Sequence, residues 1–184
     1  ENMIDHKIMV PFSMKKSFHV EWIAKEGKYT IRDTIAKLKD AEGKTSNITM
    51  TQKWPVKIPL THFKQKIRPG KIFQTGMRVI DTLNPITEGG TGYVPGPFGT
   101  GKTVLQQAIA KNSEAEILIV VACGERANEV VEIFTEFPQL IDPVSGRKLD
   151  EKTTIVCNTS NMPVAAREAS VYVGMTMAEY YRNM

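Results

Sequence analysis

The sequence of 184 residues has few of the features that mark secreted, metal-rich or membrane-spanning proteins. It contains two cysteines, Cys123 and Cys157, and three histidines, and none of these lies in a closely spaced metal-ligand set. The longest apolar run, residues 117–123, is far shorter than the about 20 residues that a transmembrane helix needs. We therefore expect no disulfide framework, no metal cluster and no membrane span, and we expect both cysteines to be buried structural thiols.

A secretory signal and a disordered composition are also missing. The first residues lack the basic and then apolar order of a signal peptide, so none is expected, and the absence of a disulfide framework fits a reducing cytoplasm. The chain begins with Glu1 rather than methionine, so we expect an internal fragment of a longer protein. With 41% hydrophobic residues and a net charge of +4, the composition is that of a globular protein.

The charge is divided unevenly along the chain. Residues 1–75 hold 15 lysines and arginines against 7 acidic residues, whereas residues 76–184 hold 9 against 13. Such asymmetry can indicate a patch that faces nucleic acid or a membrane. Because the lysines are scattered along alternating strand patterns, solvated strand faces are the preferred interpretation.

The first third of the chain has the pattern of a small antiparallel β domain, which we place at residues 1–57. Short runs rich in β-branched and aromatic residues are separated by glycine-containing turns, and they predict strands at residues 19–23, 29–31, 34–39 and 47–50. Prolines then exclude a continuous helix or central strand, so residues 58–70 are interpreted as a linker.

From residue 71 onward, strand patterns alternate with helix patterns. The expected strands are residues 92–94, 117–122 and 154–157, and the expected helices are residues 77–83, 102–111, 127–137 and 163–184. A turn is expected at residues 142–146. This alternation predicts an α/β fold with a parallel sheet, whose strand at 117–122 is apolar enough to be buried on both faces.

A glycine-rich loop lies between the first of these strands and the helix that follows. It matches the phosphate-loop pattern G-x-x-x-x-G-K-[ST] at Gly96, Pro97, Phe98, Gly99, Thr100, Gly101, Lys102 and Thr103. Glycines let the backbone approach an anion, and the amides at the start of the helix, to which Val104 belongs, point toward it. Lys102 is expected to contact the β- and γ-phosphates of a nucleotide, and the Thr103 hydroxyl to bind Mg²⁺.

The strand at residues 117–122 is followed by Gly124, Glu125 and Arg126 at the sheet edge where open α/β sheets bind ligands. If this strand lies beside the strand that precedes the loop, Glu125 faces the γ-phosphate and is placed to activate water. The residues alone favour a helix cap with an ion pair equally well.

Polar residues also follow the third strand, at 158–161. They either line the site or cap the helix through Ser160 or Asn161, and capping is the preferred interpretation. Arg167 and Glu168 are compatible with a functional role or with a solvated helix face.

Together these motifs resemble the A subunit of vacuolar/archaeal-type rotary ATPases. The resemblance rests on the glycine-rich loop with its Pro97–Phe98 pair, on residues 124–126 and on residues 158–170, with further likeness at residues 6–11, 52–56 and 76–82. It implies a RecA-like nucleotide-binding domain at residues 71–184, preceded by part of a β-rich insertion at residues 1–57.

The resemblance also implies an activity and partners. These are ATP hydrolysis or synthesis coupled to proton or sodium-ion translocation, with ATP or ADP and Mg²⁺ bound. Glu125 is implied as the catalytic carboxylate, with Lys102 and Arg126 near the γ-phosphate. The implied partners are the B subunit, in an alternating hexamer of three A and three B subunits, and the central stalk. Contact with the membrane is implied only through the complex, and none with nucleic acid.

The sequence departs from this family in three ways. Thr100 and Ala127 stand where the family often has serine and glycine, and neither change alters the charge. No apolar strand followed by aspartate occurs after Thr103, so we expect the second magnesium-site aspartate beyond Met184. We therefore expect a truncated nucleotide domain that is inactive when isolated.

Two alternatives stay open. One is a ring-forming RNA helicase or translocase of the transcription-terminator type, which shares the fold and which the basic first half would suit. The other is a non-catalytic subunit that binds nucleotide for assembly. Such a subunit has no need of a carboxylate at Glu125.

Overall fold

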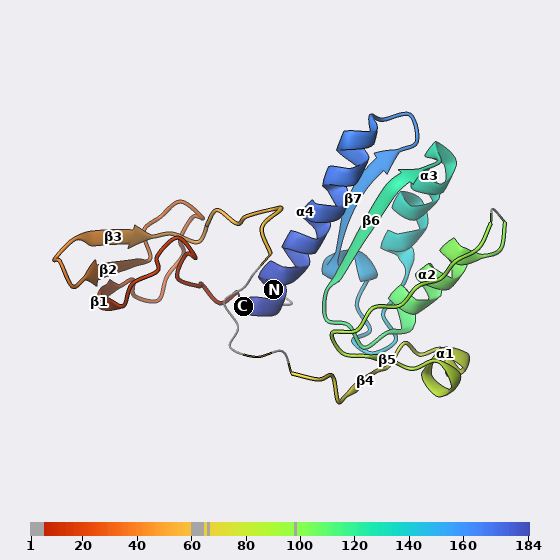
Figure 1. The fold of residues 1–184 in the computed structure, drawn as a ribbon, viewed down its shortest axis with the longest axis horizontal. Helices are drawn as coiled ribbons and strands as arrows, with labels where there is room; N and C mark the ends of the chain where they lie inside the picture. Colours follow the sequence, from red (N-terminus) through yellow and green to blue (C-terminus); the bar gives the residue numbers. More distant parts are fainter. Residues whose placement is uncertain (1–5, 60–64, 66, 98) are drawn as a thin grey trace. The chain divides into compact units, whose positions relative to one another are not determined.

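The computed structural model describes residues 6–59, 65, 67–97 and 99–184 (Figure 1). The chain divides into two units, one made of Glu1–Pro59 with Thr176–Met184 and the other of Leu60–Met175. Among the described residues, none of the helices has both the length and the apolar character to span a membrane.

The first unit contains a three-stranded antiparallel sheet in the order β1 (Phe18–Ile23), β2 (Ala36–Asp40) and β3 (Thr45–Ile48). Leu38 of β2 and Ile48 of β3 are buried on one face. Lys37 and Lys39 alternate with Leu38 and are exposed. This period of two explains why three of the four strands expected here form.

The fourth expected strand, at residues 29–31, is wrong. The Tyr29 hydroxyl donates a hydrogen bond to the carbonyl of Lys25 at 2.6 Å. The amide of Thr30 donates to the Asp33 carboxylate at 2.7 Å. These local side-chain bonds close a loop and compete with strand pairing.

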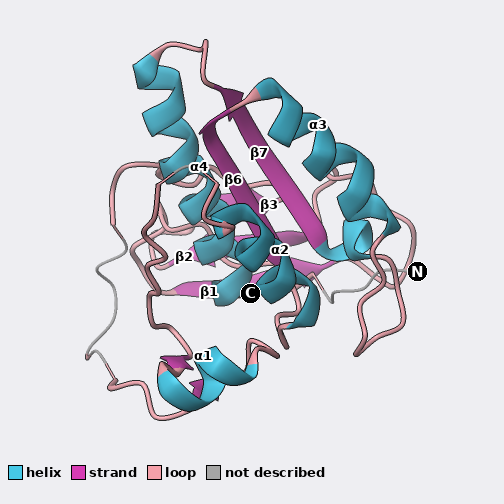
Figure 2. Ribbon diagram, turned by 90° about the vertical axis from the view of Figure 1, so that its right-hand side faces the viewer, coloured by secondary structure: helices cyan, strands magenta, loops and turns pink. Residues whose placement is uncertain are grey.

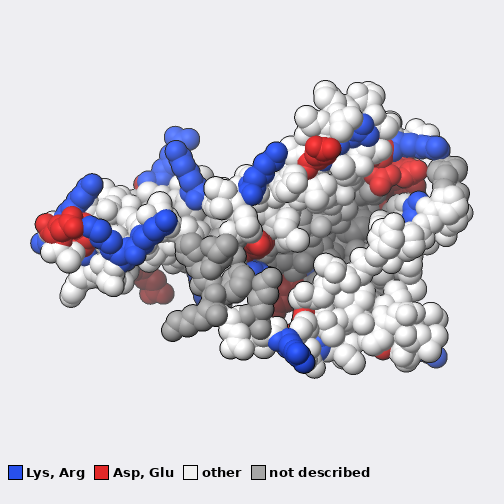
Figure 3. Space-filling model, in the orientation of Figure 1, with Lys and Arg blue, Asp and Glu red and all other residues white. Residues whose placement is uncertain are grey.

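Basic side chains of the first unit project into solvent, with acidic side chains among them (Figure 3). Lys16 pairs with Glu42 at 2.6 Å, and both side chains are largely exposed. The Lys37 ammonium lies 5.9 Å from the centre of the Trp22 ring. These positions agree with the interpretation of the excess lysines as solvated strand faces.

An aromatic cluster belongs to the same unit. Trp54 makes edge contacts with Phe12 at 4.4 Å and with Tyr180 at 5.3 Å between ring centroids. The Tyr180 hydroxyl lies 2.8 Å from Nε2 of His6. These rings give the small unit an apolar centre besides Leu38 and Ile48.

The second unit begins with a two-stranded antiparallel pair, β4 (Ile72–Phe73) and β5 (Ile86–Thr87), with helix α1 (Arg78–Leu83) between them. The Asp81 carboxylate accepts hydrogen bonds from the Thr75 amide at 3.0 Å, the Thr75 hydroxyl at 2.7 Å and the Gly76 amide at 3.1 Å. Thr75 is fully buried, so these bonds satisfy polar groups that have left water.

The rest of the second unit is an α/β arrangement. Helix α2 (Lys102–Asn112) precedes strand β6 (Leu118–Glu125), which pairs in parallel with β7 (Thr153–Thr159). Helix α3 (Ala127–Glu136) and the short turns η1 (Phe137–Gln139) and η2 (Leu149–Lys152) connect the strands, and α4 (Val164–Asn183) follows β7. The expected parallel sheet and the expected helices at 102–111, 127–137 and 163–184 are confirmed.

Three expectations are wrong in detail. Residues 92–94 join no strand ladder within the described chain, and Tyr93 is 88% exposed. Strand β6 is half-buried along most of its length rather than fully buried, since within the described residues it pairs along one edge only, and Ala122 is its buried residue. Cys123 is exposed and Cys157 half-buried, so neither is the buried thiol that was expected.

The two faces of the β6–β7 pair are covered by different helices (Figure 2). Val121 and Ile119 face α4, because both approach the position where Gly174 would carry a Cβ atom. Cys123 faces the same helix and donates a hydrogen bond from Sγ to the Arg167 carbonyl at 3.0 Å. Helix α3 contacts both strands and covers the other face.

A β-bulge at the end of β6 reverses this alternation. Cys123 pairs with Asn158, but the next pair joins Glu125 to Thr159, so Gly124 is an extra residue. Regular alternation would place Glu125 on the α4 face beside Cys123. The extra residue instead moves Glu125 to the face covered by α3, which is how a bulge redirects a side chain.

Glycine is needed at the bulge for two reasons. Gly124 has a φ of +79°, in the left-handed region that side chains with a Cβ atom disfavour. A Cβ atom here would also lie 3.0 Å from Nη1 and 3.1 Å from Cδ of Arg167.

A buried ion pair holds the connection between α3 and β7. Lys152 and Asp142 lie 3.0 Å apart, with side chains 3% and 5% exposed. The Lys152 ammonium also donates to the carbonyl of Ala115 at 2.9 Å. Hydrogen bonds from Ser145 and Val144 and the pairing with Lys152 lower the pKa of Asp142 to about 2. The turn expected at residues 142–146 is confirmed, since the Gly146 amide donates to the Asp142 carbonyl at 2.8 Å.

The substitution Gly124→Ala tests the bulge. We expect the full-length protein to lose about 1–2 kcal/mol of stability from the left-handed backbone, and more from the contact with Arg167. Thermal unfolding measures this loss. Gly146→Ala is the matched control, because Gly146 has a φ of +70° and open space around it. Equal losses in the two variants would contradict a contact between Gly124 and Arg167.

The substitution Asp142→Asn tests the buried ion pair. We expect a loss of about 3 kcal/mol in the free energy of unfolding, because the Lys152 ammonium stays buried without its counter-charge. In the parent protein, the pKa of Asp142 is lower when folded than when unfolded. The free energy of unfolding should therefore fall as the pH is lowered from near 4 through the folded-state pKa of about 2. Urea unfolding measures both effects. Glu42→Gln, at the exposed pair with Lys16, should cost less than about 1 kcal/mol.

Candidate functional site

The glycine-rich loop is shaped by two left-handed residues in front of α2. Gly99 has a φ of +79°, and Gly101 has a φ of +80° at the position that flanks the helix. The Gly101 carbonyl accepts the first helical bond, from the amide of Leu105 at 3.0 Å. The loop therefore leads directly into a helix N-terminus, where backbone N–H groups and the helix dipole favour an anion.

Side chains brace this loop from within. The Thr100 hydroxyl donates to the Pro97 carbonyl at 2.7 Å. The Lys102 ammonium donates to the carbonyl of Gly96 and, at 3.4 Å, to that of Pro97. Lys102 thus lies along the loop, and its ammonium group can exchange these carbonyl partners for a bound anion. Phe98, a further residue of the sequence motif, lies outside the described residues.

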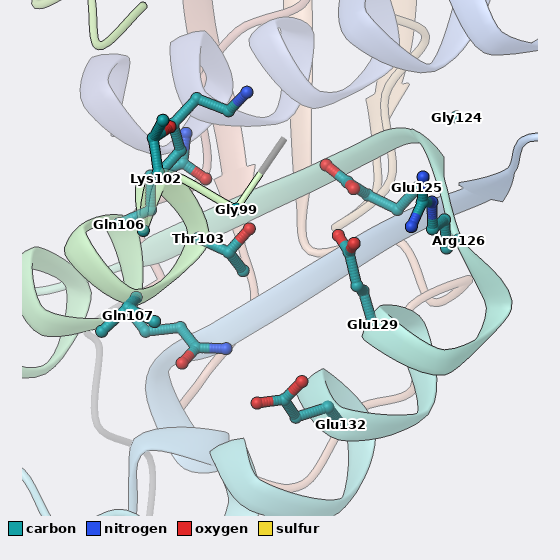
Figure 4. A pocket seen from close by; sticks show the side chains of 13 residues that line it. Gly99, Lys102, Thr103, Gln106, Gln107, Gly124, Glu125, Arg126, Glu129 and Glu132 are labelled. Atoms are coloured by element: carbon teal, nitrogen blue, oxygen red, sulfur yellow. The ribbon is translucent and has the colours of Figure 1, made fainter. Parts of the chain in front are cut away.

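The loop and the end of β6 line one cavity of about 540 Å³ (Figure 4). The loop and α2 form one wall, and the bulge and α3 form the other. The lining residues are Gly99, Thr100, Gly101, Lys102, Thr103, Val104, Gln106, Gln107, Gly124, Glu125, Arg126, Glu129 and Glu132. Eight of these belong to the residues singled out from the sequence for binding or catalysis, and the structure brings their two motifs together.

The pKa of Glu125 is raised above its usual value. The largest cause is a hydrogen bond with the Glu129 carboxyl, followed by burial and by the negative charge of Glu129, while the positive charge of Lys102 opposes them. Figure 4 shows the carboxyl groups of Glu125 and Glu129 next to each other, and both point toward Thr103. A carboxylate whose pKa is moved toward neutrality is a better proton acceptor.

Sequence reasoning missed part of this wall. Glu129 and Glu132 project from α3, and Gln107 projects from α2 one turn after Thr103. A signal was present, because Glu129 and Glu132 are three residues apart, which places their side chains on one face of the helix that follows Glu125.

Three predicted positions lie less centrally. Arg126 lines the cavity next to Glu125 and flanks α3 with an extended backbone. Val104 also lines it and is 68% exposed. Gly96 is not a lining residue, but a Cβ atom there would lie 2.6 Å from the Thr100 hydroxyl, so it gives the loop its close packing.

The polar residues after β7 have structural partners. The Ser160 amide donates to the Glu125 carbonyl at 2.9 Å, which ties the two strand ends together. Asn161 forms a hydrogen bond with the Thr159 hydroxyl. The Pro163 carbonyl accepts from the amides of Ala166 and Arg167, so Pro163 takes the flanking position of α4 that was expected of Ser160 or Asn161.

The donor set of the cavity fits a hard divalent cation beside an anion. Thr103 offers a hydroxyl oxygen, and the opposite wall offers carboxylate oxygens, which are the ligand types that Mg²⁺ takes. The loop amides and the Lys102 ammonium, next to Thr103 on the loop wall, stabilise an anion. Such a cavity can hold a polyphosphate between a binding wall and a proton-accepting wall.

Comparisons with known proteins agree with this geometry. The family model of the ATP synthase alpha/beta family, nucleotide-binding domain, matches residues 76–184. The ATPsynthase alpha/beta subunit barrel-sandwich domain matches residues 1–57.

Curated relatives include the V-type ATP synthase alpha chains of Borrelia hermsii and Treponema denticola, which are 53% and 52% identical over all 184 residues. The chain spans about a third of their length, 32% and 31% respectively.

A solved structure is also similar. It is the assembled ATPase EscN in complex with its central stalk EscO, from the type III secretion system of enteropathogenic E. coli. The TM-score is 0.51 at 29% identity, and the match covers 67% of this chain and 28% of that one. Because the nucleotide-binding model matches more than half of the chain, this protein belongs to the ATP synthase alpha/beta family.

Proposed function

We propose that this chain is part of a catalytic A subunit of a vacuolar/archaeal-type rotary ATPase, which hydrolyses or synthesises ATP in step with proton or sodium-ion transport. The observation that carries the proposal is the shared cavity of the phosphate loop and Glu125. The relatives named V-type ATP synthase alpha chain support it over the full length of the chain.

In the proposed reaction, the loop amides and the Lys102 ammonium bind the β- and γ-phosphates. Glu125 orients a water molecule and accepts its proton as the water oxygen bonds to the γ-phosphorus. The bond between the γ-phosphorus and the bridging oxygen breaks, and ADP leaves with that oxygen. Positioning and charge stabilisation of this kind account for most catalysis of phosphoryl transfer. Arg126, beside Glu125 in the cavity, is proposed to stabilise the negative charge of the γ-phosphate.

Magnesium and nucleotide are the proposed ligands. Thr103 would hold Mg²⁺ through its hydroxyl, and the cation would neutralise charge on the phosphate oxygens. A second aspartate, from a strand beyond residue 184, is proposed to complete the site in the longer protein. Residues 96–104, including Pro97, Phe98 and Val104, are proposed as the nucleotide-binding segment.

The proposed partners follow from the family. We propose assembly with a B subunit in an alternating hexamer and contact with a central stalk, at the cytoplasmic side of a membrane that the complex spans. The assembled EscN ATPase, which is in complex with a central stalk, supports this arrangement. We also propose residues 1–57 as an insertion domain and residues 58–70 as the linker to the nucleotide domain.

The alternatives are not favoured. The family model and the curated relatives give no support to an RNA helicase of the terminator type. A non-catalytic nucleotide-binding subunit would have no use for a proton-accepting carboxyl group at Glu125, whose pKa is raised within the cavity.

The substitution Glu125→Gln tests the catalytic role. In the assembled full-length enzyme, we expect ATP turnover to fall by about 100-fold or more, because the amide cannot accept a proton. Nucleotide affinity should stay within about threefold, since Glu125 lies on the wall opposite the loop, and equilibrium binding of a fluorescent nucleotide measures it. Glu136→Gln, at the end of α3 and outside the cavity, is the control. Unchanged turnover in Glu125→Gln would favour the non-catalytic alternative.

The substitution Glu129→Gln tests the acidity of the pair. Glu129 raises the pKa of Glu125, so removing its charge should lower that pKa. Because the deprotonated carboxylate of Glu125 accepts the proton, turnover should then persist to lower pH than in the parent. The pH dependence of kcat measures the position of this acid limb. A limb that stays in place or moves to higher pH would refute the coupling, and Glu136→Gln again serves as the control.

A further inference from the structure

Arg167 lies directly behind the bulge that directs Glu125 into the cavity. It belongs to the first turn of α4, the helix that covers the face of the β6–β7 pair opposite α3 (Figure 2). Its Cδ and Nη1 atoms approach the position of a Cβ atom at Gly124 to 3.1 and 3.0 Å. The side chain therefore covers Gly124 from the rear, one residue before Glu125.

The backbone of Arg167 is fixed where it meets the strand. Its carbonyl accepts hydrogen bonds from the Cys123 thiol at 3.0 Å and from the buried Ser170 hydroxyl at 2.6 Å. Its amide donates to the Pro163 carbonyl at 3.2 Å. The Cys123 bond joins α4 to the residue just before the bulge, so the side chain of Arg167 starts from a defined position.

The side chain itself is costly to place there. Nε of Arg167 is buried, and among the described residues no group accepts a hydrogen bond from it. A buried N–H group without a partner costs about 1–3 kcal/mol. The side chain nevertheless lies with Cδ against Gly124, one residue before Glu125, so its stem fills the space behind the bulge.

We propose that Arg167 is a positioning residue for Glu125. Its side chain packs against Gly124 and stabilises the bulge, so that the Glu125 carboxylate stays on the cavity side. This inference rests on the proposed function. Without the side chain, the space behind Gly124 opens, and the peptide before Glu125 can turn toward α4. Regular alternation, which places residue 125 on the α4 face, then competes with the bulge. Arg167 does not line the cavity, so it acts through the backbone of Gly124 and not on the nucleotide.

The experiment compares Arg167→Ala, Arg167→Met and Arg167→Lys in the assembled full-length enzyme. We expect Arg167→Ala to lower kcat by about tenfold or more, the scale seen when a catalytic group is misplaced, while the Kd for a fluorescent nucleotide stays within about threefold. Arg167→Met and Arg167→Lys both keep a long aliphatic stem against Gly124, so both should recover most of kcat. A fall in kcat without a matching fall in affinity separates positioning from general damage to the fold.

Several outcomes would overturn the inference. It fails if Arg167→Ala leaves kcat unchanged, if nucleotide affinity falls as much as kcat, or if Arg167→Met is as slow as Arg167→Ala. Glu125→Gln in the same assay keeps the two proposals apart. A slow Glu125→Gln with a normal Arg167→Ala removes only the positioning role, whereas a normal Glu125→Gln removes the catalytic proposal itself.

A second measurement reads the contact independently of turnover. The thermal destabilisation by Gly124→Ala should be smaller in an Arg167→Ala background, because the side chain that the new methyl group meets is gone. Gly146→Ala should cost the same in both backgrounds. Additive losses for Gly124→Ala and Arg167→Ala would also refute the inference.

Discussion

The arrangement of the site depends on a single extra residue in the β6–β7 ladder. The alternation of Ile119, Val121 and Cys123 directs these side chains toward α4, and it would direct residue 125 there as well. Gly124 interrupts the period of two, which a left-handed glycine makes possible at little cost. The carboxyl group of Glu125 consequently shares a cavity with Lys102, although the two residues belong to different strand–helix units of the sequence.

Polar contacts hold both ends of the β6–β7 pair in place. At the carboxyl end, the Ser160 amide bonds the Glu125 carbonyl, so β7 fixes the backbone of the catalytic candidate. At the opposite end, the buried Lys152 ammonium links the Asp142 turn to the Ala115 carbonyl just ahead of β6. A pair of two strands has few ladder hydrogen bonds, and these polar links add fixed points to it at both ends.

Local patterns predicted much of this structure, and long-range pairing explains the remainder. The alternation of Lys37, Leu38 and Lys39 and the glycine-rich loop before α2 were readable because their causes lie within a few residues. The strand expected at residues 92–94 and the full burial of β6 depended on neighbouring strands, which a local pattern cannot supply. The bulge was hidden for a related reason, since Gly124 reads as a turn until its pairing with β7 is known. Glu129 was within reach of the sequence, through its spacing from Glu132 on one face of the helix that follows Glu125.

The distribution of charge across the cavity separates binding from proton acceptance. The loop wall contributes backbone amides and the Lys102 ammonium, which stabilise an anion whatever the protonation of the opposite wall. The α3 wall contributes carboxyl groups close enough for Glu129 to raise the pKa of Glu125. Placing both functions on one wall would pair Lys102 directly with Glu125, which would lower the pKa of the carboxyl group and weaken it as a proton acceptor. The cavity between the walls is therefore a condition for the chemistry, because it keeps the lysine available to phosphate and the carboxyl group available to water.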